Sequence, residues 1–340
     1  MADISTNRGL APMKSSLLRW LAVLVVLALL LALPWIAKAA GSSATILLAT
    51  RILIFAIAAG SLNLVLGIGG MVSFGHAAFF GIGGYVVAIL GFHHADGSLF
   101  MGLVPGTNQL LIALPVAVLV TAIFAALIGA LSLRTGGVQF IMITLAFAQM
   151  AFFLFSALTT YGGEDGLMMR RPNEFLGLNL RQRPTMYFVA LGAAALCFFG
   201  FYRFMNSSFC TVLDGLRQNP RRMAAIGIAP YRYRLLAFVL SGAGTGLAGA
   251  LMANVLRFTS PDMLSWNLSG QFMIMVILGG VGTLWGPLIG AAVLLILEDK
   301  LNGLTEHWPL ILGLLLLVVV LRTPGGLMAL TSQVTGRMRK

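Results

Sequence analysis

Apolar runs of membrane-spanning length fill most of this 340-residue chain. About 20 consecutive apolar residues are needed for a helix to cross the hydrocarbon core of a bilayer. Hydrophobic residues make up 59% of the sequence and charged residues 9%, whereas soluble proteins carry roughly 25% charged residues. The sequence therefore predicts an all-α polytopic membrane protein with eight to ten transmembrane helices. The apolar runs are residues 17–33, 46–66, 72–92, 110–133, 138–158, 186–202, 235–256, 272–297 and 309–321.

The run 272–297 contains an unusual density of helix-breaking residues. It is interrupted by Gly279, Gly280, Gly282, Gly286 and Pro287. Three structures fit this pattern: one long helix, two short helices joined by a turn, or a re-entrant hairpin. Broken backbone at membrane depth is tolerated only where protein or a water-filled cavity satisfies the freed polar groups. If the run is split, the chain has ten spans.

Two glycine-rich segments resemble each other. One is Gly70-Met-Val-Ser-Phe-Gly75 followed by Gly81, and the other is Gly282-Thr-Leu-Trp-Gly286 followed by Gly290. Transporters are often built from repeated halves that carry broken helices at matching positions. The pattern therefore has two interpretations: an internal duplication with glycine-broken helices, or a resemblance in composition alone.

The first apolar run has some features of a secretory signal. Arg19 lies at its start, and Ala37-Lys38-Ala39 resembles a cleavage site. A signal sequence has an apolar core of only about 7–15 residues and is followed by a secreted domain, but here the run is longer and more membrane sequence follows. We therefore expect a retained anchor, and a permease domain over residues 17–325.

The distribution of arginines predicts the orientation in the membrane. Segments 161–184 and 203–234 flank a single span and must lie on opposite sides. Their charges sum to +1 and +5, respectively. Cytoplasmic loops carry an excess of Lys and Arg, so we place residues 203–234 in the cytoplasm. The tails 1–16 and 326–340 are also basic, which predicts that both termini are cytoplasmic and that the number of spans is even.

Charged residues are confined to the ends of the runs. The net charge of +12 would suggest nucleic-acid binding in a soluble protein, but here it marks topology, and we predict no nucleic-acid partner. Ion-coupled carriers usually keep ionisable groups inside the membrane. The chain also lacks the phosphate-binding G-x-x-x-x-G-K-[ST] motif, metal-ligand clusters and any hydrolase constellation. We therefore expect a transport protein that is not an enzyme, has no cofactor and takes its energy from a partner.

A short helix is predicted in the basic cytoplasmic segment. Asn219 suits the N-cap, Pro220 the first helical position, and Gly227 the residue just past the C-terminal end. The helix in between is about two turns long and needs a surface to lie on. Arg221 and Arg222 suit either acidic groups of a partner or lipid phosphates, so both interpretations stay open on spacing alone.

Small and uncharged polar residues in the runs have structural and functional interpretations. Ridges of small residues at 242, 246 and 250, and at 241, 245 and 249, predict close helix packing. The polar side chains could line a transport pathway or form hydrogen bonds between helices. We expect His76, between Gly75 and Ala77, to be a neutral structural donor rather than a catalytic base. The pathway candidates are Asn63, Ser73, His76, Gln139, Thr144, Gln149 and Gln271.

Several separate stretches resemble the LivH/LivM family, the membrane permease subunits of bacterial ATP-binding-cassette (ABC) importers for branched-chain amino acids, and most closely the LivM type. Ser73-Phe-Gly-His-Ala-Ala-Phe-Phe-Gly-Ile-Gly-Gly-Tyr85 is the most specific of them. The resemblance extends from about residue 45 to residue 325. The other matching stretches are 62–72, Thr144-Leu-Ala-Phe147, Gly162-Gly-Glu-Asp-Gly166, Arg217-Gln-Asn-Pro220, Ala224-Ala-Ile-Gly227 and Leu278-Gly-Gly-Val-Gly-Thr-Leu-Trp-Gly-Pro287.

The resemblance implies a function for the cytoplasmic helix. In the family this segment docks in a groove of the ATPase, which favours the partner over the lipid interpretation. The acidic residue that many importers carry at the start of the motif is absent here, where Arg222 or Met223 stands. The implied coupling residues are Asn219, Pro220, Arg221, Arg222, Ala224, Ala225 and Gly227.

The resemblance also implies the remaining parts of a transport system. We expect a homologous permease subunit, two cytoplasmic ABC ATPases and a periplasmic substrate-binding protein, assembled in the bacterial inner membrane and working by alternating access. The partial charges of broken-helix ends in segments 67–84 and 279–290 could hold a zwitterionic amino acid. Alternatives are a permease for urea, short amides or another small polar solute, or an ATP-independent channel. The turn 161–166, predicted to be external, contacts the binding protein or is an ordinary turn.

Overall fold

The computed structural model describes residues 30–38, 43–100, 104–169, 173–175, 177–303, 307–322 and 325–328. The chain divides into two units, residues 1–46 and 47–340. In the smaller unit, residues 30–38 are helical. The predicted tail 1–16, most of the first apolar run and most of the tail 326–340 lie outside the described residues.

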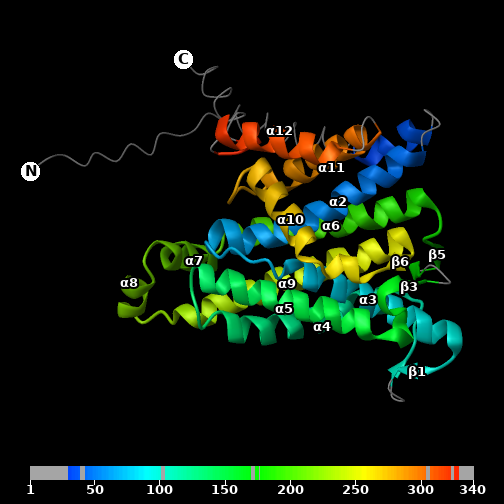
Figure 1. The fold of residues 1–340 in the computed structure, drawn as a ribbon, viewed down its shortest axis with the longest axis horizontal. Helices are drawn as coiled ribbons and strands as arrows, with labels where there is room; N and C mark the ends of the chain where they lie inside the picture. The colour runs from blue at the N-terminus through cyan, green and yellow to red at the C-terminus, as the bar shows by residue number, and fades with distance from the viewer. Residues whose placement is uncertain are drawn as a thin grey trace, which may run out of the picture. The chain divides into compact units, whose positions relative to one another are not determined.

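Six helices among the described residues are long and apolar enough to cross a membrane. They coincide with the predicted runs between 46 and 256, and the prediction of an all-α polytopic membrane protein is confirmed. The chain reverses direction after each of them, so that consecutive helices are antiparallel (Figure 1). They are α2 (Ser43–Asn63), α3 (His76–Asp96), α4 (Leu110–Ser132), α5 (Val138–Ala157), α6 (Arg183–Met205) and α9 (Pro230–Leu256).

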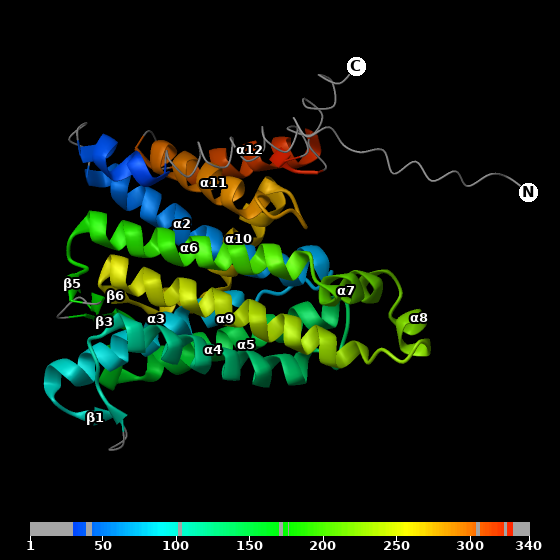
Figure 2. The ribbon, with the colours of Figure 1, turned by 180° about the vertical axis from the view of Figure 1, so that it is seen from behind.

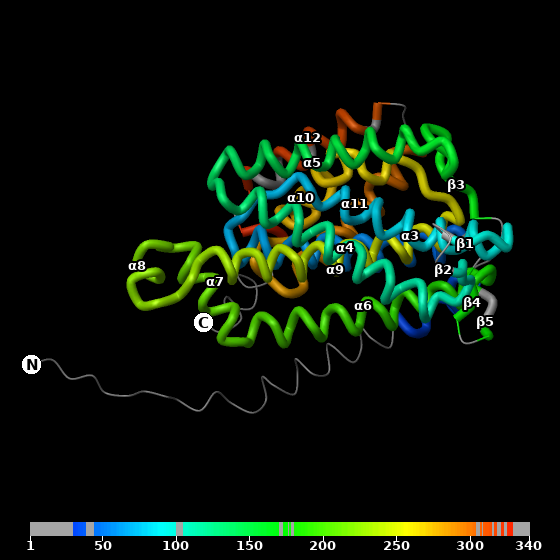
Figure 3. Tube along the Cα trace, turned by 90° about the horizontal axis from the view of Figure 1, so that it is seen from below, coloured from blue at the N-terminus to red at the C-terminus, as the bar shows by residue number. Residues whose placement is uncertain are grey.

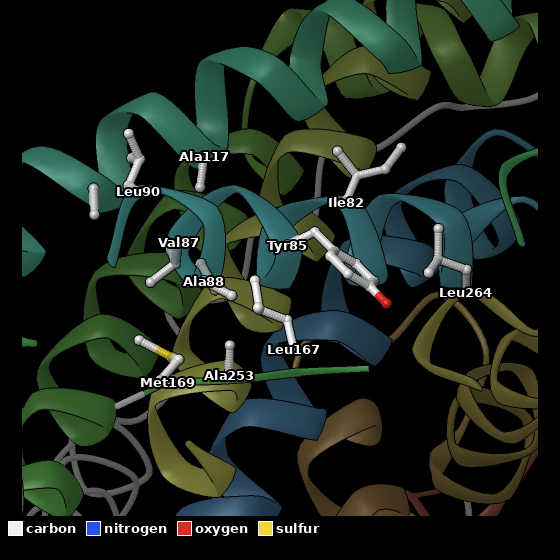
Figure 4. Packing of buried hydrophobic residues seen from close by; sticks show 12 residues of the cluster. Ile82, Tyr85, Val87, Ala88, Leu90, Ala117, Leu167, Met169, Ala253 and Leu264 are labelled. Carbon is white, nitrogen blue, oxygen red and sulfur yellow. The ribbon is translucent and has the colours of Figure 1, made fainter. Parts of the chain in front are cut away.

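Helices α3 and α9 form the centre of the larger unit. Small residues allow this, because a Cβ on Gly83 would clash with the backbone of Gly246, and one on Gly249 would clash with the carbonyl of Phe80. The prediction that the ridges around residue 246 serve close packing is confirmed. Figure 4 shows the apolar cluster around this seam, with Tyr85 and Leu90 on α3 and Ala117 on α4.

The predicted run 272–297 is split into two short helices. Helix α10 (Trp266–Gly279) and helix α11 (Gly286–Asn302) pack against each other, so closely that a Cβ on Gly290 would clash with the carbonyl of Met275. A single long helix is therefore wrong. In the turn between them, Gly280 and Gly282 have φ angles of +125° and +76°, which side chains disfavour. Helix α12 (Trp308–Arg322) follows.

One end of the larger unit carries short strands that hold the loops together. β3 (Leu167–Met168) pairs antiparallel with β6 (Phe258–Thr259), which joins the loop before α6 to the loop after α9 (Figure 2). Two small hairpins lie at the same end: β1 (Leu99–Phe100) with β2 (Val104–Pro105) in the loop between α3 and α4, and β4 (Glu174–Phe175) with β5 (Leu178–Asn179) in the loop before α6. Single turns of 3₁₀-helix complete this end: η2 (Thr159–Tyr161), η3 (Gly163–Asp165) and η4 (Pro261–Leu264).

The opposite end carries two short helices that follow α6. They are α7 (Ser208–Gln218) and α8 (Pro220–Ala225), and α8 is the element farthest from the strand end in Figure 3. The hydroxyl of Tyr231, in the first turn of α9, donates to the carbonyl of Ala130 near the end of α4 at 3.0 Å. The loop 133–137 therefore lies at the same end as α7 and α8.

Helices α4, α5 and α6 expose apolar side chains that a soluble protein would bury. Leu119, Leu127, Phe153, Leu196 and Phe199 are each more than half exposed. Exposed apolar surface of this extent marks contact with lipid or with another membrane protein. The fold is thus a membrane bundle in which α3 and α9 are enclosed and α4 to α6 are peripheral.

Candidate functional site

Helix α8 has the predicted capping residues. The side chain of Asn219 accepts a hydrogen bond from the amide of Arg222 at 3.0 Å, Pro220 begins the helix, and Gly227 follows it with a φ of +88°. None of its residues is buried. The predicted short helix is confirmed, and its side chains are available to a partner.

Helix α7, which the sequence analysis did not predict, supplies the surface under α8. Met223 of α8 lies against Gly215 of α7, where a Cβ would be 2.9 Å from the Met223 sulfur. Leu213 and Leu216 are buried on the opposite side of α7. Ser207 caps the helix by accepting from the amide of Cys210 at 3.4 Å. This serine, followed by an amphipathic pattern, is the signal from which α7 could have been predicted.

Cys210 lies in the first turn of α7, outside the spanning helices. Burial raises the pKa of its thiol, and the carboxylate of Asp214 raises the pKa further. The cysteine is therefore mostly protonated and weakly nucleophilic at neutral pH. It is a packing residue rather than a reactive one.

The first glycine-rich segment is a break between α2 and α3. Helix α2 continues as one turn of π-helix, η1 (Leu64–Ile68), and the chain then runs without regular structure to His76, where α3 begins. The predicted run started at residue 72, so α3 begins four residues later than expected. Gly70, with a φ of +66°, permits the turn. We call residues 64–75 the first break, and the turn 280–285 the second break.

The two breaks touch each other. A Cβ on Gly67 would lie 2.5 Å from the amide nitrogen of Gly282. Asn63, at the end of α2, bridges them: its side-chain oxygen accepts from the amide of Gly282 at 2.8 Å, and its side-chain nitrogen donates to the carbonyl of Thr283 at 2.8 Å. The Asn63 side chain is almost fully buried, and the turn that it binds is partly exposed.

Hydroxyl groups of other helices hold the first break. Ser269 of α10 accepts from the amide of Ala77 at 2.8 Å and donates to the carbonyl of Phe74 at 2.6 Å. Thr144 of α5 accepts from the amide of Phe74 at 3.3 Å, and Ser73 accepts from the amide of Gly75 at 3.2 Å. The sequence analysis missed Ser269, because a serine in an apolar helix carries no local sign of its distant partner.

His76 is a structural donor, as predicted. The single hydroxyl hydrogen of Ser241 is donated to the carbonyl of Ser61, so the Ser241 oxygen accepts from Nε2 of His76 at 2.8 Å. The other ring nitrogen, Nδ1, is buried and has no hydrogen-bond partner. The ring is therefore a neutral tautomer that links α3 to α9 and, through Ser241, to α2.

The structure brings together only part of the predicted pathway set. Asn63, Ser73, His76 and Thr144 all lie at or next to the first break. Gln139 is exposed near the start of α5, away from this group. Gln149 and Gln271 are half-buried on α5 and α10, and neither is among the side chains that hold the break.

The arrangement offers polarised backbone rather than ionised side chains. Helices end or begin at both breaks. The terminal amides and carbonyls of a helix have no hydrogen-bond partner within that helix, and they give its ends partial charges. A zwitterionic or small polar solute can be met by such groups without a buried ion. The described residues contain no group of three or more His, Cys, Asp or Glu side chains that could hold a metal ion.

Comparison with known proteins identifies the family. Residues 44–321 match the family described as "Branched-chain amino acid transport system / permease component". The chain belongs to this family. The LivM permease protein of the high-affinity branched-chain amino acid transport system of Escherichia coli (strain K12) is 26% identical over 314 residues, which cover 85% of this chain and 71% of that protein. LivM of Salmonella typhimurium (strain LT2) is 26% identical over 308 residues, covering 84% and 70%, respectively. No solved structure matches the chain.

Membership of this permease family confirms the resemblance inferred from the sequence. The matched region begins within α2 and ends at the last turn of α12. It therefore includes both breaks and the α7–α8 segment. The elements with the most irregular backbone thus lie inside the family domain and are not additions to it.

Proposed function

We propose that the chain is the LivM-type permease subunit of an ABC importer in the bacterial inner membrane, and that it carries branched-chain or related small amino acids. A single observation supports this most directly: α8 is a capped helix of six residues with no buried side chain. Met223 rests on α7, which gives this short helix a surface on one side. Its exposed face, which includes Ile226 at 68% exposure, suits the groove of a partner.

The charges at the two ends support a cytoplasmic position for α8. The α7–α8 end carries Arg134 and the six arginines between 203 and 234, against the single acid Asp214. In the loops at the strand end, acidic and basic residues balance. This asymmetry follows the positive-inside rule and supports a cytoplasmic position for the end that carries α7 and α8. The basic tails 1–16 and 326–340 are proposed to lie on the same side.

Partners complete the proposed system. Two cytoplasmic ABC ATPases would receive α8 of this chain and its counterpart in a homologous permease subunit, and a periplasmic binding protein would deliver the solute to the strand end. The exposed turn at Glu164 and Asp165 lies at that end and is proposed as part of the surface for the binding protein. Hydrolysis on the ATPases would drive alternating access.

Co-expression tests the docking. We expect a detergent pulldown of the tagged chain to recover an ABC ATPase, and the substitutions Ala225→Trp and Gly227→Trp to abolish its recovery. Leu127→Trp, on the exposed side of α4, is the matched bulky control and should leave recovery unchanged. Normal recovery with both α8 variants would exclude the docking role and favour an ATP-independent channel.

Reconstitution tests the transport. The assembled system in proteoliposomes should concentrate leucine when ATP and the binding protein are supplied, and the isolated chain should not. Accumulation of urea instead of leucine would assign the alternative substrate class. Uphill accumulation by the isolated chain would contradict the importer assignment.

A further inference from the structure

Arg217 connects helix α7 directly to the first break. It lies in the last turn of α7, and its Nη1 donates to the carbonyl of Gly67 at 2.6 Å. The two residues are 150 positions apart in the sequence. Arg217 is therefore a contact between the proposed ATPase-docking segment and the irregular backbone inside the bundle.

The carbonyl of Gly67 is a strong acceptor for this arginine. It lies in the single turn of π-helix at the end of α2, where the last carbonyls have no partner within the helix and carry partial negative charge. A guanidinium makes a charge-assisted hydrogen bond to such an oxygen, which is stronger than a neutral one. π-Helical turns are frequently found at functional positions in helices.

Gly70 makes room for the arginine. It has a φ of +66°, and a Cβ at this position would lie 2.8 Å from Cγ of Arg217. Glycine is therefore needed at position 70 for two reasons. It adopts the positive φ, and it leaves space for the aliphatic part of the Arg217 side chain. The first break is shaped around this side chain.

The contact continues from the first break to the second. The backbone of Gly67 lies against that of Gly282, and Asn63 is hydrogen-bonded to Gly282 and Thr283 of the second break. Two successive direct contacts, Arg217 to Gly67 and Gly67 to Gly282, thus lead from α7 to the turn between α10 and α11, and the bonds of Asn63 reinforce the second.

We infer that Arg217 is the positioning residue through which movement of α7 and α8 is transmitted to the two breaks. This inference rests on the proposed function. Arg217 is more than a third exposed. Its guanidinium can therefore replace the hydrogen bond to the Gly67 carbonyl by one to water, and no charge is left buried without a partner. The bond is therefore suited to being broken and remade in each transport cycle, whereas the two hydrogen bonds of the almost fully buried Asn63 keep the two breaks together.

The test measures leucine imported per ATP hydrolysed by the complete complex in proteoliposomes. With Arg217→Gln we expect this ratio to fall by about tenfold, because the charge-assisted bond is lost, while the ATPase is still recovered in pulldown and still hydrolyses ATP. Arg217→Lys keeps a cationic donor and should retain most of the ratio. Arg203→Gln, an exposed arginine at the end of α6, is the matched control and should behave as the wild type.

The outcomes separate this inference from the proposed function. An unchanged ratio with Arg217→Gln, or loss of ATPase recovery together with transport, overturns the positioning role. If the Arg217→Gln permease itself does not fold, Arg217→Lys decides: a retained ratio supports the role, and a tenfold loss contradicts it. A wild-type complex that recovers no ATPase and imports no leucine refutes the proposed function itself.

Discussion

The two breaks look alike in sequence but are held in different ways. The first is tied by side chains from α5, α7 and α10, namely Thr144, Arg217 and Ser269. The second largely closes on itself, because the Thr283 hydroxyl donates to the carbonyl of Gly280 and accepts from the amide of Gly286. Among the described residues, only the first break is tied to helix α7 by a side-chain hydrogen bond. The first break is therefore held by side chains from three other helices, whereas the second is held by Thr283 within its own turn and by Asn63 of α2.

The largest effect is expected where the breaks touch. Gly67→Ala would place a Cβ 2.5 Å from the amide of Gly282, and backbone on both sides leaves little room to relax. We expect this variant to unfold at a lower temperature by several degrees, since overpacking of this kind costs about 1–3 kcal/mol, and to import little leucine. The measurement is thermal unfolding of the purified permease, together with import by the complex.

Gly303→Ala is the matched control for that substitution. Gly303 has an ordinary helical φ of −78°, and its nearest prospective neighbour is 3.6 Å away. This variant should unfold at the wild-type temperature. Equal effects of the two substitutions would mean that the breaks do not touch as described.

A smaller effect should distinguish how the breaks are held. Ser269→Ala leaves the buried amide of Ala77, at the start of α3, and the partly buried carbonyl of Phe74, in the first break, without their partner. A buried polar group without a partner costs about 1–3 kcal/mol. Thr283→Ala removes two hydrogen bonds within a short turn that is half-exposed, where water can replace them. We expect the Ser269 variant to lower the free energy of unfolding and the rate of leucine import more than the Thr283 variant. The reverse order would reject the distinction between the two breaks.

The smallest effect concerns the packing of α7 beside the first break. In a Cys197→Ser background, Cys210 is the only cysteine, and its thiol pKa is raised by burial and by Asp214. At pH 7 the reactive thiolate fraction is therefore below that of an ordinary cysteine, whose pKa is about 8.5. The rate of maleimide labelling should be low at pH 7. It should still increase with pH in the range where the rate for a free thiol has become constant.

Asp214→Asn provides the control for the labelling measurement. It removes the carboxylate charge and should lower the thiol pKa and speed the reaction, without reaching the rate of a free thiol. A wild-type rate equal to that of free cysteine would show that α7 is not packed as the structure has it.

The spanning helices and α8 could be predicted because their causes are local. Hydropathy marks a span within its own 20 residues, and the caps at Asn219 and Gly227 lie beside the helix that they end. The run 272–297 was ambiguous, because its five helix-breaking residues are compatible both with a turn between two helices and with a bend in one helix. The contact of Gly290 with Met275 decides this, and that contact depends on the fold.

The links between the breaks could not be predicted from the sequence for the same reason. Asn63, Ser73, His76 and Thr144 were identified as polar residues in apolar surroundings, but their partners lie 70 to 220 positions away or in irregular backbone. Arg217 was counted as a topology signal, and Ser269 was missed. The π-helical turn also has no sequence signature of its own. The internal duplication stays a prediction, because the differing anchorage of the breaks neither requires nor excludes it.

The contact between α3 and α9 limits which helices of this bundle can move apart. Where Gly83 meets Gly246 and Phe80 meets Gly249, the two backbones touch with no side chain in between. Such a contact resists sliding of one helix along the other. We therefore expect α3 and α9 to move as one rigid unit, and the surrounding helices to move relative to it. An alternating-access cycle that separated α3 from α9 would have to open this direct backbone contact.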